Sequence, residues 1–191
     1  MIERRLQRAV GPRYLPYKER FQRESGILSA LAEIGLGPGV LICDTDFFVR
    51  SFLPGLTLKY MPLPDLEHWL PEVLKAIDRM CGSGIFHTDP NAGNVIIDKH
   101  AKKIGFIDSE IPARIRTERT LSDEDRRFCH ERLLYTLSRD WMNRGLPSST
   151  MKQKILSGAY NYYNSTPCGL LTPQRAVDLL TGKEIQTGIP K

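Results

Sequence analysis

The residues best suited to chemistry lie in the polar segment His87-Thr-Asp89-Pro-Asn-Ala-Gly-Asn94 and, further along the chain, in Asp108. A carboxylate such as Asp89 can accept the proton of a hydroxyl group and align that hydroxyl for attack. Asn94 offers an amide oxygen and Asp108 a carboxylate, and both are hard ligands of the kind that Mg²⁺ binds. We expect His87 to orient the segment by packing and hydrogen bonds. These residue types suit the transfer of a phosphoryl group to a hydroxyl.

Apolar strands on both sides should position this polar segment. Ile85-Phe86 precedes it, Val95-Ile-Ile97 follows it, and a further strand, Ile104-Gly-Phe-Ile107, leads directly into Asp108. If the two later strands form a hairpin, Asn94 and Asp108 lie beside each other. Both oxygens could then hold one metal ion.

The same residues also have a purely structural interpretation, because Asn, Asp, Pro and Gly are common in turns. In that interpretation His87, Asp89 and Asn94 build a polar turn, and Asp108 caps the segment after it. The functional interpretation is favoured because the pattern H-x-D-x-x-x-x-N is followed by a carboxylate at a suitable distance. Strands also flank the segment as the chemistry requires.

The remaining sequence predicts an α+β fold with small antiparallel strands and several helices. A helix is expected from Pro16 to about Ile34, closed by Gly35, and residues 1–10 could form a short strand. Strands are expected over 39–43 and 47–53. Further helices are expected over 65–70, from Pro71 to Met80, from Ser122 to about Asn143, over 149–163, and from Thr172 to Gly182.

Length and composition are those of an ordinary globular protein. The chain has 191 residues, of which 41% are hydrophobic and 26% charged, and its formal net charge is +5. This size fits one domain or two packed lobes at about 100–200 residues per domain. The positive charge favours anionic partners such as nucleotides, phosphorylated substrates or RNA.

The cysteines and the N-terminal sequence indicate the cellular compartment in which we expect the protein. Cys43, Cys81, Cys129 and Cys168 have no C-x-x-C or zinc spacing, so we expect reduced thiols in a cytoplasmic protein. The first residues lack an apolar secretory core, and the sequence has no run of about 20 apolar residues that could cross a membrane.

Residues 84–110 resemble the catalytic and metal-binding loops of the protein-kinase-like superfamily. They look like those of lipopolysaccharide-core kinases, aminoglycoside and choline phosphotransferases, the small kinase of the tRNA threonylcarbamoylation complex, and atypical kinases linked to ubiquinone biosynthesis. Asp108-Ser-Glu110 stands in place of D-F-G and is similar to the D-x-E of aminoglycoside-type enzymes. The resemblance implies a minimal kinase-like fold, with a reduced N-lobe and hinge over 1–55 and a mostly helical C-lobe over 56–191.

The resemblance also implies ATP and Mg²⁺ as cofactors, with Asp89, His87 and Asn94 as catalytic residues and Asn94 and Asp108 as metal ligands. Phe21-Gln-Arg-Glu24 resembles the helix whose glutamate pairs with the ATP-binding lysine. The remaining residues implied on the nucleotide side are Arg8, which is nearest to the place of that lysine, and Arg50 and Phe52 at the hinge.

Departures from the family pattern leave alternatives open. The sequence has no G-x-G-x-x-G, its lysine is not evident, and Glu24 could be a solvated helix residue. One alternative is therefore a catalytically impaired pseudokinase that binds a nucleotide or a partner. Another is a kinase associated with RNA. The acceptor hydroxyl could belong to a protein, a sugar, a lipid-linked sugar or a small molecule.

Overall fold

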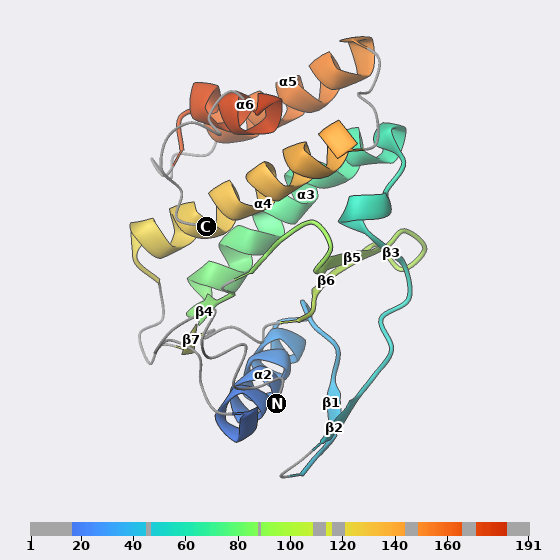
Figure 1. Ribbon diagram of the computed structural model, residues 1–191, viewed down its shortest axis with the longest axis vertical. Helices are drawn as coiled ribbons and strands as arrows, with labels where there is room; N and C mark the ends of the chain where they lie inside the picture. The colour runs from blue at the N-terminus through green and yellow to red at the C-terminus, as the bar shows by residue number, and fades with distance from the viewer. Residues whose placement is uncertain are drawn as a thin grey trace.

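The computed structural model of the protein describes residues 17–44, 47–87, 89–108, 114–115, 121–143, 149–165 and 171–182. This part has five α-helices and three small antiparallel sheets, and four of the helices lie together at one end of the molecule (Figure 1). The elements are α2 (Tyr17–Glu33), β1 (Val40–Cys43), β2 (Phe48–Arg50), β3 (Leu56–Thr57), the short 3-10 helix η2 (Leu58–Tyr60), α3 (Leu63–Gly82), β4 (Ile85–Phe86), β5 (Val95–Asp98), β6 (Lys103–Phe106), β7 (Arg114–Ile115), α4 (Asp123–Asn143), α5 (Ser149–Ser165) and α6 (Pro173–Thr181).

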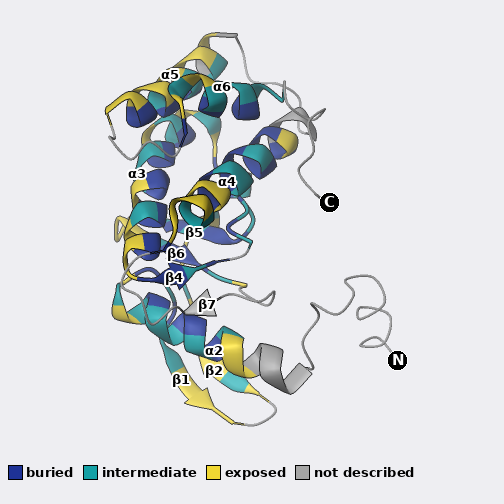
Figure 2. Ribbon diagram, turned by 90° about the vertical axis from the view of Figure 1, so that its left-hand side faces the viewer, coloured by how far each residue is buried: buried dark blue, intermediate teal, exposed yellow. Residues whose placement is uncertain are grey.

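The first part of the described chain is the helix α2 with the β1–β2 hairpin beside it (Figure 1). Ile27, Leu28 and Leu31 recur at helical spacing and are buried in the core. Gly35 ends the helix region at a φ of 69°, a left-handed conformation that glycine adopts without steric cost. The hairpin is largely exposed, with Leu41 66% exposed, and β1 is mostly yellow in Figure 2. Few contacts therefore hold these two strands in place.

A three-stranded antiparallel sheet in the order β3-β5-β6 carries the polar segment. Val95 lies opposite Phe106 across β5 and β6, and both side chains are fully buried. Gly55 introduces β3 at a φ of 129°, where an added Cβ would lie 2.2 Å from the carbonyl oxygen of Ile97. Glycine therefore allows β3 to approach β5 closely.

The helix α3 corrects the sequence prediction of two helices, over 65–70 and from Pro71 to Met80. The structure has one continuous helix with Pro71 inside it. Proline cannot donate a hydrogen bond to the carbonyl of Glu67, and its ring crowds that carbonyl. An added Cβ on Gly158 of α5 would lie 3.8 Å from the Glu67 oxygen and 3.9 Å from Cγ of Pro71. Close packing of α5, together with the buried apolar face of α3, compensates for the proline.

A polar cluster joins α3, α4 and α5 inside the helical part. The Asp78 carboxylate accepts hydrogen bonds from Arg126 at 3.1 Å, from His130 Nε2 at 3.1 Å, and from the hydroxyl of Tyr162. The other ring nitrogen of His130 lies 2.8 Å from the Tyr163 hydroxyl. Burial alone would raise the pKa of Asp78, but the hydrogen bonds from His130, Tyr162 and Arg126 and the nearby His130 charge hold it below its ordinary value of 3.8. The cluster therefore depends on an ionised Asp78.

The α+β fold class is confirmed, and most predicted elements are present within one or two residues of their expected bounds. The β2 strand is shorter than the predicted 47–53, because only Phe48–Arg50 pairs with β1. Two short strands, β3 and β7, were not predicted. The predicted strand within 1–10 lies outside the described residues. Of the helices described, none is long and apolar enough to cross a membrane.

Candidate active site

His87 is fully buried at the start of the polar segment. Its Nδ1 accepts a hydrogen bond from the backbone N–H of Asp89 at 3.2 Å, so the ring proton resides on Nε2, which donates to the carbonyl of Ile107 at 3.1 Å. Burial lowers the pKa of His87 from 6.5 to about 4, against the opposing effects of that carbonyl and of the Asp89 charge. A neutral His87 thus ties the polar loop to the end of β6.

Both carboxylate oxygens of Asp89 are engaged. Oδ1 accepts from Nε of Arg132 at 2.9 Å, and Oδ2 accepts from the Asn91 amide at 2.8 Å. The Asn91 side-chain oxygen in turn accepts from the backbone N–H groups of Gly93 at 2.7 Å and Asn94 at 3.2 Å. These bonds hold the Asp89 carboxylate in one orientation.

Asn94 lies between Asp89 and Asp108. Its amide nitrogen donates to the backbone carbonyl of Asp89 at 3.0 Å and to that of Asp108 at 3.4 Å. Because both partners are acceptors, the NH₂ group must face them, and the side-chain oxygen points elsewhere. Within the described part of the chain nothing donates to that oxygen. The oxygen is therefore suited to a cation.

Asp108 follows β6 and is exposed. It adopts a φ of 60°, which is uncommon for a residue with a Cβ and typically costs 1–3 kcal/mol. The backbone N–H of the preceding Ile107 donates to the carbonyl of Asn94 at 3.0 Å. The hairpin thus brings Asp108 beside Asn94, as the sequence predicted. Glu110, the last residue of the D-x-E-like motif, lies outside the described residues.

One face of α4 holds the polar loop at three points. The contacting residues are spaced by three and four positions, so they share a side of the helix. The bonds run from Cys129 Sγ to the His87 carbonyl at 3.5 Å, from Arg132 to the Asp89 carboxylate at 2.9 Å, and from the Ala92 N–H to Thr136 Oγ1 at 3.2 Å. Sequence analysis missed all three residues of α4. Their only signal was helical spacing, which does not reveal a distant partner.

An apolar cavity of about 430 Å³ lies between the predicted hinge and the β5–β6 hairpin. Phe52, Leu53 and Pro54 line it from the hinge, and Ile96 and Gly105 line it from the hairpin. Most of its lining is apolar, as a flat heterocyclic base requires, and Ser51, Asp98 and Lys103 add polar groups. Its lining includes Ile96, two residues after Asn94, so a ligand there would lie near the polar loop.

The residues predicted to bind the nucleotide differ in whether they line the apolar cavity. Phe52 is 85% exposed and lines the apolar cavity, whereas Arg50 is exposed on β2 and does not line it. Glu24 is half-buried on α2. Arg8 lies outside the described residues, so its pairing with Glu24 stays a prediction.

The fold defined by these elements is protein-kinase-like, which confirms the family resemblance at the level of the fold. The chain is similar to WaaP, a lipopolysaccharide-core kinase solved in complex with acyl carrier protein, with a TM-score of 0.53 and 18% sequence identity. This similarity covers 84% of the present chain and 76% of WaaP.

A second similar structure is the Rio2 kinase-ADP/Mg²⁺-phosphoaspartate complex from Chaetomium thermophilum. Its TM-score is 0.49 and its identity 18%, and the similarity covers 86% of the present chain and 49% of that protein. No protein-family model matches the sequence, and comparison with curated proteins gives no match either.

Proposed function

We propose that this protein is an ATP- and Mg²⁺-dependent phosphotransferase that moves the γ-phosphate of ATP to a hydroxyl group. One observation carries the proposal. In a kinase-like fold, the side-chain amide of Asn94 bonds to the backbone carbonyls of both Asp89 and Asp108, so the candidate base and the two candidate metal ligands are neighbours.

Asp89 accepts the proton of the acceptor hydroxyl and aligns its oxygen for attack. A carboxylate held from both sides keeps one geometry, and orientation of the attacking group is the main demand of phosphoryl transfer. His87 contributes position only, because a deeply buried neutral imidazole with both nitrogens engaged has no proton to exchange with substrate.

Asn94 and Asp108 suit Mg²⁺ by their chemistry. They provide an amide oxygen that no described residue donates to and a carboxylate at the end of β6, both hard oxygen ligands. A bound Mg²⁺ would supply charge that neutralises the phosphates. The described residues hold no group of three acidic, His or Cys side chains that could bind a metal by themselves. Nucleotide phosphates and water would complete such a site.

The base of ATP would lie in the apolar cavity against Phe52 and Ile96. We place the boundary between the two lobes near residue 55, because β3, which begins at Leu56, pairs with β5 of the catalytic hairpin. Arg50 and Glu24 would act from the N-lobe side, together with Arg8. The acceptor could be a protein, a sugar or a lipid-linked sugar. A protein partner draws support from WaaP, which was solved with a carrier protein.

Calorimetric titration of ATP with and without Mg²⁺ tests the proposal. The wild-type protein should bind ATP more tightly with Mg²⁺, and Asp108→Ala should lose this enhancement because a hard ligand of the ion is gone. Asp123→Ala, which removes an exposed carboxylate at the start of α4, serves as the control and should bind like wild type. Equal Mg²⁺ enhancement in Asp108→Ala and wild type would refute the metal assignment.

The competing function is a pseudokinase that binds nucleotide without turning it over. The absence of G-x-G-x-x-G favours it, and so does the Asp89 carboxylate, whose two oxygens are both already bonded. Mg²⁺-dependent formation of ADP separates the two functions. An enzyme should form ADP, and Asp89→Asn should slow it by about 10²–10⁴. A pseudokinase would also gain stability when it binds ATP, about 2.7 kcal/mol at 100 times the Kd, but it would form no ADP.

A further inference from the structure

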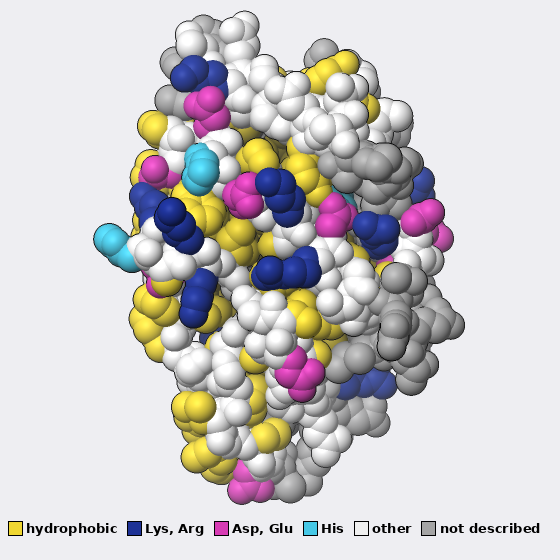
Figure 3. Space-filling model, turned by 180° about the vertical axis from the view of Figure 1, so that it is seen from behind, with side chains coloured by type: hydrophobic (Ala, Val, Ile, Leu, Met, Phe, Trp, Pro, Cys, Tyr) yellow, Lys and Arg dark blue, Asp and Glu magenta, His cyan; other side chains and the backbone are white. Residues whose placement is uncertain are grey.

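A second cavity, of about 500 Å³, lies where α3, the turn after α2 and the β5–β6 turn meet. None of its lining residues belongs to the loop 87–94. Figure 3 shows the face of the molecule opposite to that in Figure 1, where Lys and Arg side chains lie among exposed hydrophobic and acidic ones. We call this cavity the α3 groove.

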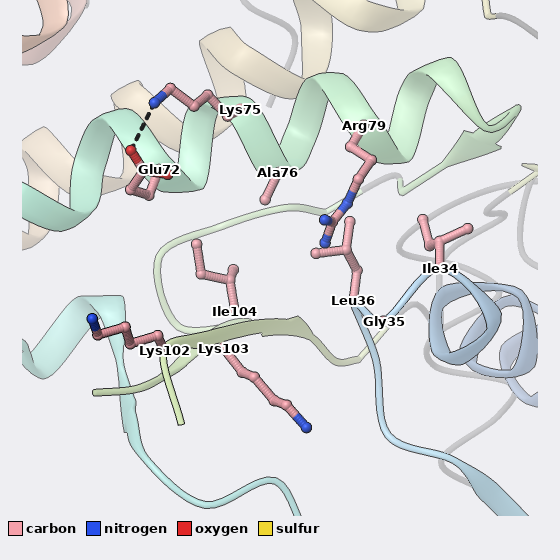
Figure 4. Close-up of a pocket in the computed structure, with 10 residues that line it drawn as sticks. All are labelled: Ile34, Gly35, Leu36, Glu72, Lys75, Ala76, Arg79, Lys102, Lys103 and Ile104. Carbon is pink, nitrogen blue, oxygen red and sulfur yellow. Dashed lines mark hydrogen bonds and ion pairs between the residues drawn. The ribbon is translucent and has the colours of Figure 1, made fainter. Parts of the chain in front are cut away.

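The charges that line the α3 groove are unbalanced. Lys75 and Arg79 come from α3, Lys102 comes from the β5–β6 turn, and Lys103 is the first residue of β6. Of the described residues that line the groove, Glu72 alone is acidic, and its carboxylate pairs with Lys75 at 2.7 Å. The other three cations have no ion-pair partner in the part of the chain that is described. In Figure 4 the Arg79 guanidinium lies in the space of the groove, whereas the ammonium groups of Lys102 and Lys103 extend away from it at its rim.

The side chains of the α3 groove combine this charge with an apolar floor. In Figure 4 the guanidinium of Arg79 extends from α3 toward Leu36, while Ala76 and Ile104 face each other across the space. Leu36 and Ala76 are buried and Ile104 is half-buried, so apolar surface lies directly below the cation. A ligand that fits both features has an anionic head and an apolar body.

Lys102 is held in an unusual backbone conformation at the edge of this groove. Its φ is 51°, in the left-handed region where residues with a Cβ are uncommon. Asn or Gly would adopt this conformation at lower cost. Lys102 thus lies at the rim of the groove in a conformation that local backbone preference does not explain, with its ammonium group extending outward in Figure 4.

We propose that the α3 groove binds a phosphate monoester whose remaining part is apolar. The planar fork of an arginine matches the oxygens of phosphate, and lysines add charge without fixed geometry. A nucleic acid is disfavoured because the described residues that line the groove include no aromatic side chain, and stacking on aromatic rings is a main source of single-strand binding. The α3 groove contains no residue of loop 87–94, although it shares Gly35, Lys103 and Ile104 with the cavity beside the predicted hinge, and the proposal does not depend on the proposed kinase function.

Calorimetry with monobutyl phosphate, inorganic phosphate and 1-butanol tests the proposal on the full chain. Monobutyl phosphate should bind most tightly, because its butyl group covers Ala76 and Ile104 while its phosphate meets Arg79. Arg79→Gln should weaken it about tenfold or more, the usual loss for a hydrogen bond to a charged group. Arg127→Gln is the matched control, because Arg127 is exposed on α4 outside the groove and should leave binding unchanged.

Two further experiments test whether the phosphate monoester belongs to a lipid and whether it binds in the α3 groove. Vesicles of phosphatidylcholine with phosphatidic acid should bind in an Arg79-dependent way if the monoester is part of a lipid, and should not bind if it is a free molecule. Asp108→Ala should keep full affinity for monobutyl phosphate whether or not the chain is a kinase. Four results would overturn the proposal. They are a loss of affinity for monobutyl phosphate in Asp108→Ala, wild-type affinity in Arg79→Gln, tighter binding of an RNA oligonucleotide at the same residues, and no binding of either monobutyl phosphate or the vesicles.

Discussion

Asp89 is held by a residue far away in sequence. Arg132 donates from α4 across a gap of 43 residues at 2.9 Å, and each partner is about one-third exposed. An ion pair with this exposure contributes little to stability, typically below 1 kcal/mol. Its value should therefore lie in geometry, because Nε of Arg132 and the Asn91 amide together fix the plane of the carboxylate.

Arg132→Gln should lower the kcat of Mg²⁺-dependent ADP formation by roughly tenfold to 100-fold, because a misplaced catalytic group costs rate. The Kd for Mg²⁺-ATP should stay unchanged, since Arg132 contacts Asp89 and not the apolar cavity. Arg132→Lys should recover only part of the rate, because an ammonium lacks the guanidinium geometry. Steady-state kinetics and calorimetry give the two readouts.

Arg139→Gln is the control for this prediction, since it removes an exposed arginine about two turns further along the same side of α4. It should behave like wild type in both measurements. If Arg132→Gln keeps its kcat, or loses nucleotide affinity and rate together, a positioning role for Arg132 is wrong.

At the level of elements, α4 acts as the support of the polar loop. Thr136 lies at its third contact point, where Oγ1 accepts from the buried Ala92 N–H and donates to a carbonyl of its own helix. Within the loop, the side chains of His87, Asn91 and Asn94 make further hydrogen bonds. The contacts with α4 add support from a distant element, which helps to fix the position of Asp89.

Thr136→Val should destabilise the protein by about 1–3 kcal/mol, because valine fills the space but leaves the buried Ala92 N–H without a partner. Chemical denaturation measures the loss. Thr181→Val is a matched control, because the Thr181 hydroxyl bonds only to carbonyls of its own helix α6, and should change stability by less than about 0.5 kcal/mol. An equal loss of stability in Thr136→Val and Thr181→Val would show that the hydrogen bond between Thr136 and the Ala92 N–H does not stabilise the protein.

The sequence could predict the elements that follow from local patterns. The α2 helix, the β5–β6 hairpin and the polar loop all depend on neighbours in sequence, and the structure has them near their expected bounds. It could not predict that α3 continues through Pro71, since the compensation comes from Gly158 on another helix. Nor could it predict the Arg132–Asp89 pair, because helical spacing says nothing about what a helix face meets.

For the whole molecule, the helical part is well anchored and the N-terminal hairpin is not. Most of the core lies in α3, α4, α5, α6 and the β5–β6 hairpin, whereas β1 and β2 expose Leu41, Ile42 and Val49. The turn after α2 is joined to β6 by a hydrogen bond from the Phe106 N–H to the Leu36 carbonyl at 2.8 Å. Stability should therefore be governed by groups buried in the helical part and in the polar loop.

Two buried titratable groups make the stability of the whole molecule sensitive to acid. The His87 pKa is lowered from 6.5 to about 4, so below pH 6.5 the unfolded chain binds a proton that folded His87 does not. Stability is complete above about pH 6.5 and falls as the pH drops toward 4. The Asp78 pKa lies below 3.8, so its loss of stability follows at lower pH, where the polar cluster would have to be protonated.

The free energy of unfolding should therefore fall by roughly 3 kcal/mol between pH 6.5 and pH 4 through His87 alone, at about 1.4 kcal/mol per pKa unit. Urea denaturation at a series of pH values measures this slope. His87→Gln keeps a group that can bond to the Ile107 carbonyl but cannot titrate, so it should flatten the slope in this window and leave the loss below pH 3.8 in place. Asp78→Asn should do the reverse, losing stability at neutral pH while keeping the slope from pH 6.5 to 4. Parallel curves for wild type and His87→Gln would mean that His87 is not held neutral, and the account of how it ties the polar loop to β6 would be wrong.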